Sequence, residues 1–133
     1  MQKPVYIQEA SLITPLGFSV SENVSAIEKE QSGIHEQHQN DILDTPFYAA
    51  MIASEKIDAA FKKLGNPSRF MKLEKMMLLS VAETLEKSKL HISEKTALII
   101  ATTKGSIDAL DPDNSFSGER AYLPMLGKKI QSF

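Results

Sequence analysis

Two histidines separated by two residues are the most obvious candidate metal ligands of the chain. His35 and His38 have the His-x-x-His spacing, and Asp41 follows with a carboxylate. Zinc sites are commonly built from imidazole nitrogens, thiolates and carboxylates in tetrahedral sets. The segment around these residues is polar and offers no fourth ligand at a standard spacing. We therefore predict a solvated surface loop here and no metal site.

Nucleotide binding and covalent catalysis also lack their usual signatures. The Thr-Thr-Lys-Gly-Ser sequence at residues 102–106 has only one glycine and lacks the G-x-x-x-x-G-K-(S/T) spacing, so we expect a plain turn after a strand. The chain contains no cysteine. Ser32, Ser106 and Ser117 do not lie in a recognisable nucleophile elbow. The sequence thus predicts no catalytic, cofactor-binding or metal-binding residues.

Composition and charge narrow the class of protein. The chain has 133 residues, of which 42% are hydrophobic and 24% charged, with a net charge of −2. This length suits one domain, and the near-neutral charge argues against nucleic acid as the main partner. We see no run long enough to span a bilayer, no signal peptide and no disulfide, so we expect a cytoplasmic protein.

The first third of the chain predicts a strand, a tight turn and a capped helix. Val5 and Ile7 begin an alternating apolar pattern over residues 5–12, and Pro15 ends it. Ser19 begins the S-x-x-E capping-box pattern of a helix start. We expect Val24 and Ile27 on the buried face of this helix, and its end at Gly33.

Further elements follow in an alternating order. Residues 34–45 should form a surface loop, residues 47–52 either a strand or the front of a helix, and residues 54–64 a helix. The strongest helix covers residues 68–90, where the apolar stripe comprises Leu73, Met76, Met77, Ser80, Val81, Thr84 and Leu85. The charged residues Lys72, Lys75, Glu83, Glu86 and Lys87 lie away from this stripe, on the expected outer side. The continuous apolar run at residues 96–102 is typical of a central strand covered on both faces. A mobile loop at residues 111–119 precedes a last helix with Pro124 in its first turn. The order predicts an α/β fold.

These motifs resemble the N-terminus of a β-ketoacyl-acyl carrier protein synthase, the condensing enzyme of fatty acid and polyketide synthesis. Such enzymes open with a strand, a (T/S)P(L/V)G turn, a helix and an SGI ending. The matching residues are Thr14-Pro15-Leu16-Gly17 and Ser32-Gly33-Ile34. The long helix is similar to the family helix that opens R-x-(M/F/L)-D, and here the opening is Arg69-Phe70-Met71-Lys72.

This sequence also departs from the family pattern. The usual acidic residue is missing from the opening of the long helix, and Lys89 and Ser106 stand where the family has glycines. None of the three histidines, His35, His38 and His91, matches a catalytic position of the family. The family's nucleophilic Cys and its catalytic histidines lie in later segments that have no counterpart here.

The resemblance implies a partial thiolase-like fold, a mixed β-sheet with packed helices in which residues 1–133 supply the first part of the N-terminal half. The parent would be a 3-oxoacyl-[acyl-carrier-protein] synthase that condenses acyl and malonyl thioesters with decarboxylation. This chain alone would be inactive and hold no cofactor, since the substrates are carried on the phosphopantetheine of acyl carrier protein. One alternative is a non-catalytic carrier-protein-binding or chain-length-factor-like partner subunit, and another is an unrelated small α/β binding module.

Basic residues near the start of the long helix bear on partners. The cluster comprises Lys62, Lys63, Arg69, Lys72 and Lys75. In the resembled enzymes, basic residues near this point help to dock the acidic carrier protein, which implies docking roles for Arg69, Lys62 and Lys63. Complementary charges of this kind raise the association rate. The alternative is a solvated helix face without a partner. We also expect that apolar surface left exposed supports self-association.

Overall fold

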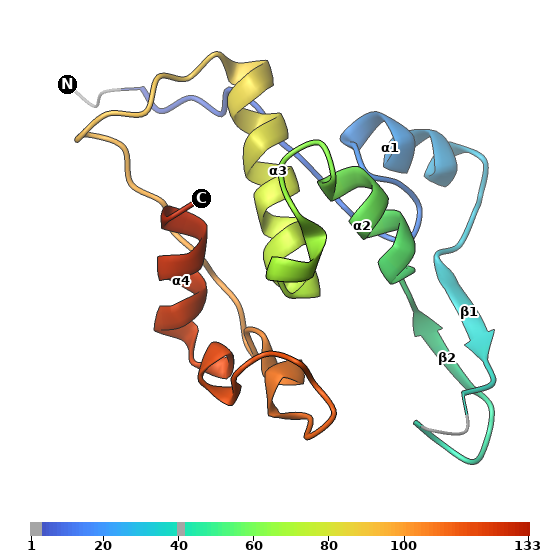
Figure 1. The fold of residues 1–133 in the computed structure, drawn as a ribbon. Helices are drawn as coiled ribbons and strands as arrows, with labels where there is room; N and C mark the ends of the chain where they lie inside the picture. The colour runs from blue at the N-terminus through green and yellow to red at the C-terminus, as the bar shows by residue number, and fades with distance from the viewer. Residues whose placement is uncertain (1–3, 40–41) are drawn as a thin grey trace. The chain divides into compact units, whose positions relative to one another are not determined.

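A computed structural model describes residues 4–39 and 42–133 (Figure 1). The helices are α1 (Val20–Glu28), α2 (Ser54–Phe61), α3 (Lys72–Ser88) and α4 (Leu123–Gln131), and the strands are β1 (Ile34–Gln37) and β2 (Phe47–Ala50). Three short 3-10 helices cover Pro67–Arg69, Ile107–Leu110 and Gly118–Ala121. The fold is therefore mixed α/β. The chain divides into two compact units, residues 1–56 and residues 57–133.

In the first unit, β1 and β2 form a two-stranded antiparallel sheet in which Ile34 lies opposite Ala50 and Glu36 opposite Tyr48. The surface loop expected at residues 34–45 is therefore wrong at its start, because residues 34–37 form β1. For residues 47–52 the sequence left a strand and the front of a helix open, and the structure has the strand β2. The sequence of β1 does not indicate a strand, because a two-stranded sheet that is exposed to solvent needs no apolar face. The rest of the predicted loop includes Asn40 and Asp41, which lie outside the described residues.

The predicted start of α1 is confirmed. The Ser19 hydroxyl accepts a hydrogen bond from the Glu22 N–H at 3.2 Å, and the Glu22 carboxylate accepts one from the Phe18 N–H at 2.6 Å. The predicted end and buried face are wrong. The helix ends at Glu28, and Glu30 rather than Gly33 takes the left-handed backbone conformation. Its buried residues are Asn23 and Ala26. Asn23 is buried because its side-chain amide donates a hydrogen bond to the Gly17 carbonyl in the preceding turn.

The strand expected at residues 5–12 is not formed, because no described segment pairs with it. Val5 and Ile7 are almost fully exposed. A strand acquires its ladder of backbone hydrogen bonds only from a neighbouring strand. The apolar alternation of these residues therefore remains without a buried face.

The core of the second unit lies between α2, α3 and α4. Phe61, Leu78, Leu126 and Ile130 form the buried cluster. Half-buried residues pack around it: Leu64, Phe70, Leu73, Met77, Leu79 and Ile100. Within this unit α3 and α4 lie side by side (Figure 1). The predicted helices at residues 54–64 and after Tyr122 are present, and Pro124 lies in the first turn of α4 as expected.

The long helix differs from its prediction at both its start and its buried face. Residues 67–69 form a separate 3-10 turn, so α3 begins at Lys72. Its buried residues are Glu74, Lys75 and Leu78. Lys75 was expected on the charged outer side, but it is buried because its ammonium pairs with the Asp58 carboxylate. Ion pairing of this kind allows a charged side chain to leave water.

The central strand expected at residues 96–102 is also not formed. This stretch is an irregular connection between α3 and the Ile107–Leu110 turn, and of its side chains Ile100 packs against the core. A central strand needs partners on both sides.

Among the residues that the structure describes, no helix is both long and apolar enough to cross a membrane.

Candidate functional site

A cleft in the second unit surrounds Arg69. Its volume is about 370 Å³. The segment between α2 and α3 forms one wall and the end of α4 the other. The lining residues are Gly65, Asn66, Arg69, Phe70, Lys129, Ser132 and Phe133. The cleft therefore combines two cationic side chains with two aromatic rings.

The turn that carries Arg69 is fixed by Asn66 and proline. The Asn66 side-chain oxygen accepts hydrogen bonds from the Ser68 N–H at 3.1 Å and from the Ser68 hydroxyl at 2.9 Å. Pro67 occupies the first turn of the 3-10 helix, where its missing N–H costs no hydrogen bond. The Phe70 N–H closes the turn on the Pro67 carbonyl at 3.2 Å. Arg69 is thus held at an exposed position beside the core.

Aromatic rings form the base of the cleft. The centroid of the Phe70 ring lies 5.1 Å from that of Phe61 and 5.5 Å from that of Phe133. The Lys129 ammonium lies 4.9 Å from the centroid of the Phe70 ring, which is a cation–π contact. Within the described part of the chain, no carboxylate pairs with Arg69 or Lys129. The cleft can therefore accept an anionic group that has an apolar neighbour.

The basic residues expected from the sequence have different fates. Lys62 and Lys63 are exposed in the turn after α2, but they do not line the cleft. Lys75 is removed from the expected cluster, because it is buried and paired with Asp58. Lys129 was missed and takes its place. The available signal was the Lys128-Lys129 pair in the last turn of an amphipathic helix.

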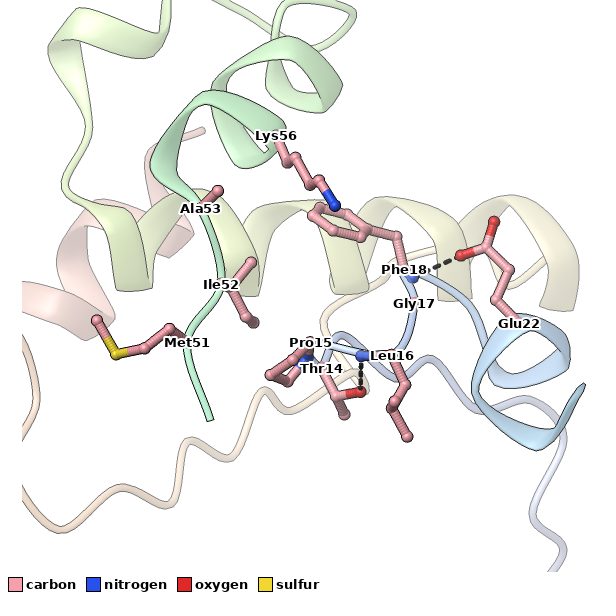
Figure 2. Close-up of a pocket in the computed structure, with 10 residues that line it drawn as sticks. All are labelled: Thr14, Pro15, Leu16, Gly17, Phe18, Glu22, Met51, Ile52, Ala53 and Lys56. Atoms are coloured by element: carbon pink, nitrogen blue, oxygen red, sulfur yellow. Dashed lines mark hydrogen bonds between the residues drawn. The ribbon is translucent and has the colours of Figure 1, made fainter. Parts of the chain in front are cut away.

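A second hollow, in the first unit, is built on the turn at residues 14–17 (Figure 2). Thr14 and Gly17 exchange two backbone hydrogen bonds, with N···O distances of 2.9 and 3.2 Å. The Thr14 hydroxyl also accepts from the Leu16 N–H at 3.0 Å. In Figure 2 the Lys56 side chain reaches to the ring of Phe18, across the hollow from Met51. The volume of this hollow is about 220 Å³.

Asn23 ties this turn to α1. Its amide nitrogen donates to the carbonyls of Leu12, Gly17 and Ser19 at 3.3, 3.1 and 2.7 Å, and its amide oxygen bonds to the Thr14 hydroxyl. The polar groups of the turn are therefore satisfied within the protein, which favours a structural role over ligand binding. The sequence offered one signal for Asn23, since asparagine is unfavourable inside a helix unless its side chain has another task.

Two further candidates from the sequence are the histidine segment at residues 35–38 and the turn at residues 102–106. His38, which follows the end of β1, has its Nε2 atom 3.3 Å from the Glu36 carboxylate, and the described residues contain no cluster of three or more potential metal ligands. At the expected turn after residue 102, the Gly105 N–H donates to the Thr102 hydroxyl at 3.1 Å. Gly105 has a φ of 61°, and a Cβ there would lie 2.7 Å from the Leu123 side chain. This glycine serves packing and turn geometry.

Comparison with known proteins assigns no family to the chain. No protein-family model, no curated protein and no solved structure matches it. The candidate site therefore rests on its geometry: Arg69 and Lys129 line one cleft, neither has a carboxylate partner in the described part of the chain, and Lys129 lies over the Phe70 ring.

Proposed function

We propose that this chain is the N-terminal part of a β-ketoacyl synthase-like protein, a 3-oxoacyl-[acyl-carrier-protein] synthase of the cytoplasm. The parent would condense acyl and malonyl thioesters with loss of carbon dioxide, in fatty acid or polyketide synthesis. One observation carries the proposal: the TPLG turn is closed by two backbone hydrogen bonds and leads directly into the Ser19-capped helix α1. This is the local geometry that the resemblance implies.

The finer architecture that we propose is a thiolase-like mixed sheet. Residues 5–12 and 96–102 would be strands of that sheet. Two features support this. Residues 5–12 carry an alternating apolar pattern and residues 96–102 are uncharged and rich in β-branched residues, and both segments leave large side chains such as Val5, Ile7 and Ile99 exposed. Apolar strands of this type are stable when neighbouring strands and helices cover them.

The chemistry of the parent would depend on groups that this chain does not contain. Condensation uses a cysteine thiolate to hold the acyl group as a thioester, and nearby imidazoles to stabilise the charge that develops after decarboxylation. The chain has no cysteine. We therefore propose that residues 1–133 bind and position, and that the reacting groups come from another segment of the parent.

The binding role that we propose is docking of the acidic acyl carrier protein at the Arg69 cleft. Arg69 is exposed and has no carboxylate partner among the described residues, and Lys129 adds a second cation to the same cleft. Lys62 and Lys63 extend the positive surface along the chain. Opposite charges steer such partners together and orient the carrier that delivers the phosphopantetheine-linked substrate.

Charge reversal at Arg69 tests this role. In the intact synthase, we expect Arg69→Glu to slow carrier-protein association about tenfold at low salt, because a rim charge acts mainly on the association rate. The difference should shrink as salt screens the charges. Stopped-flow kinetics at low and high salt measures the association rate. The matched control is Lys95→Glu, which reverses an exposed lysine that does not line the cleft. Equal association rates for Arg69→Glu and the control would refute the docking role.

A non-catalytic partner subunit is the second candidate function. It is favoured by a specific combination, the lack of cysteine together with an exposed Arg69 that has no carboxylate partner among the described residues. Such a subunit would bind the carrier protein, or a complementary catalytic subunit, and would not form a thioester. Carrier binding by the 133-residue chain itself, without any covalent acyl adduct in mass spectrometry, is its expected behaviour.

A further inference from the structure

Residues 96–103, with the sequence TALIIATT, form an uncharged segment with an open backbone. We call it the 96–103 segment. It contains no charged residue, glycine or proline. Among the described residues, none of the backbone groups from Ala97 to Thr103 pairs with another backbone group. Sequences of this type, when exposed, are templates for strand pairing with another chain.

The core of the second unit holds this segment in place by one of its side chains. Ile100 packs against the buried cluster, whereas its neighbour Ile99 is 89% exposed. Turns border the segment on each side. The Thr96 N–H bonds to the Ser93 carbonyl at 2.9 Å, and the Gly105 N–H bonds to the Thr102 hydroxyl at 3.1 Å. Part of the entropy cost of ordering the segment is therefore already met within one copy.

We propose that a second copy of this chain pairs with the 96–103 segment as an antiparallel strand centred on Ile99. In this register, two residues lie opposite each other when one stands as many positions before Ile99 as the other stands after it. Ile99 then meets Ile99 of the second copy, Leu98 meets Ile100, and Ala97 meets Ala101. The pairing is self-complementary, as a two-fold symmetric dimer requires. It buries the most exposed isoleucine of the segment against its own copy.

Charge at the ends of the segment selects this arrangement over a parallel one. The antiparallel register places Glu94 of each copy opposite Lys104 of the other, and Lys95 opposite Thr103. A parallel pair in register would instead set Glu94, Lys95 and Lys104 each against its own copy. Like charges directly opposite one another destabilise a strand pair, and opposite charges stabilise it. The inference rests on the exposure, open backbone and sequence of the 133-residue chain. In the proposed parent, neighbouring strands of the thiolase-like sheet would take the place of the second copy.

Single cysteines test the register, because the natural chain has none. Under mild oxidation, the full chain with Ile99→Cys should form a disulfide-linked dimer at least about tenfold faster than Ile92→Cys, because paired residues share a high effective concentration. Ile92 is 68% exposed and lies outside the paired stretch. Equal dimerisation rates for these two variants would overturn the proposal.

Two further cysteines distinguish antiparallel from parallel pairing. Ala97→Cys and Ala101→Cys should each cross-link slowly alone and fast when mixed, because equal positions lie about 13 Å apart along the strand, beyond disulfide reach. Fast cross-linking of Ala97→Cys with itself would indicate parallel pairing and overturn the register.

A charge variant tests the association without a covalent bond. In sedimentation experiments, Ile99→Lys should raise the dimer dissociation constant at least about tenfold, because two ammonium groups would lie opposite each other at the two-fold axis. Ile92→Lys is the matched control and should behave as the natural chain. An unchanged dissociation constant for Ile99→Lys, an equal effect of both variants, or a natural chain that stays monomeric at high concentration would each contradict the proposal.

Discussion

Arg120→Ala should lower the free energy of unfolding of the second unit by about 3–5 kcal/mol, since it removes one partner of a buried ion pair. Glu74 is 1% exposed, and its carboxylate receives the Nε and Nη2 groups of Arg120, the first at 3.0 Å. The same carboxylate accepts the Met71 N–H at 2.8 Å, so it also caps the start of α3. Without Arg120, the buried negative charge would lose both guanidinium donors and keep the Met71 N–H.

The pair Glu83 and Lys87 provides the control for this variant. It joins neighbouring turns of the same helix at 2.5 Å, but the Lys87 side chain is exposed. Lys87→Ala should therefore cost about 0.3–0.5 kcal/mol. Urea unfolding followed by helical circular dichroism measures both variants. Similar small losses for Arg120→Ala and Lys87→Ala would show that the buried pair does not hold this unit together. The double variant Glu74→Met, Arg120→Met should lose less than Arg120→Ala, since it leaves no charge unpaired.

Phe61→Ala should destabilise the same unit by about 3–5 kcal/mol, because it removes a large side chain from a packed core. Phe61 is fully buried at the end of α2. Its ring packs against Phe70 at 5.1 Å and against Phe133 at 5.8 Å between centroids. The truncation would leave a cavity beneath the Arg69 cleft. Urea unfolding again measures the loss.

Phe133 supplies the matched control for Phe61, since it belongs to the same aromatic group but is half exposed. Phe133→Ala should cost about half as much or less, because less apolar area returns to water. If Phe61→Ala cost no more than Phe133→Ala, the core would have been misplaced. Because whole domains are commonly stable by only about 5–15 kcal/mol, Phe61→Ala is also expected to lower expression of the folded chain.

Local signals in the sequence predicted the elements that local interactions decide. The Ser19 cap, the Pro124 helix start and the helix at residues 54–64 depend on side chains within a few residues. The two strands expected at residues 5–12 and 96–102 would depend on partners that are far away in the sequence. Apolar alternation indicates a capacity to pair, and only a neighbour satisfies it.

Buried charge was the second point that the sequence could not reveal. Helical spacing predicted Lys75 on the outer side of α3, and its pairing with Asp58 depends on how α2 packs beside that helix. Lys129 joins the Arg69 cleft for the same reason, since the end of α4 reaches the turn before α3 only in the folded unit. Arg69, which lines the cleft, was named from the sequence because it belongs to a local motif, and its docking role stays a prediction.

The central claim is that this chain is part of a condensing enzyme, and sequencing the DNA downstream of the Phe133 codon tests it most directly. We predict an open reading frame that continues into a strand carrying a cysteine nucleophile, followed by the later catalytic histidines, or by a histidine and an asparagine. A stop codon directly after Phe133 would contradict this account and favour the non-catalytic partner.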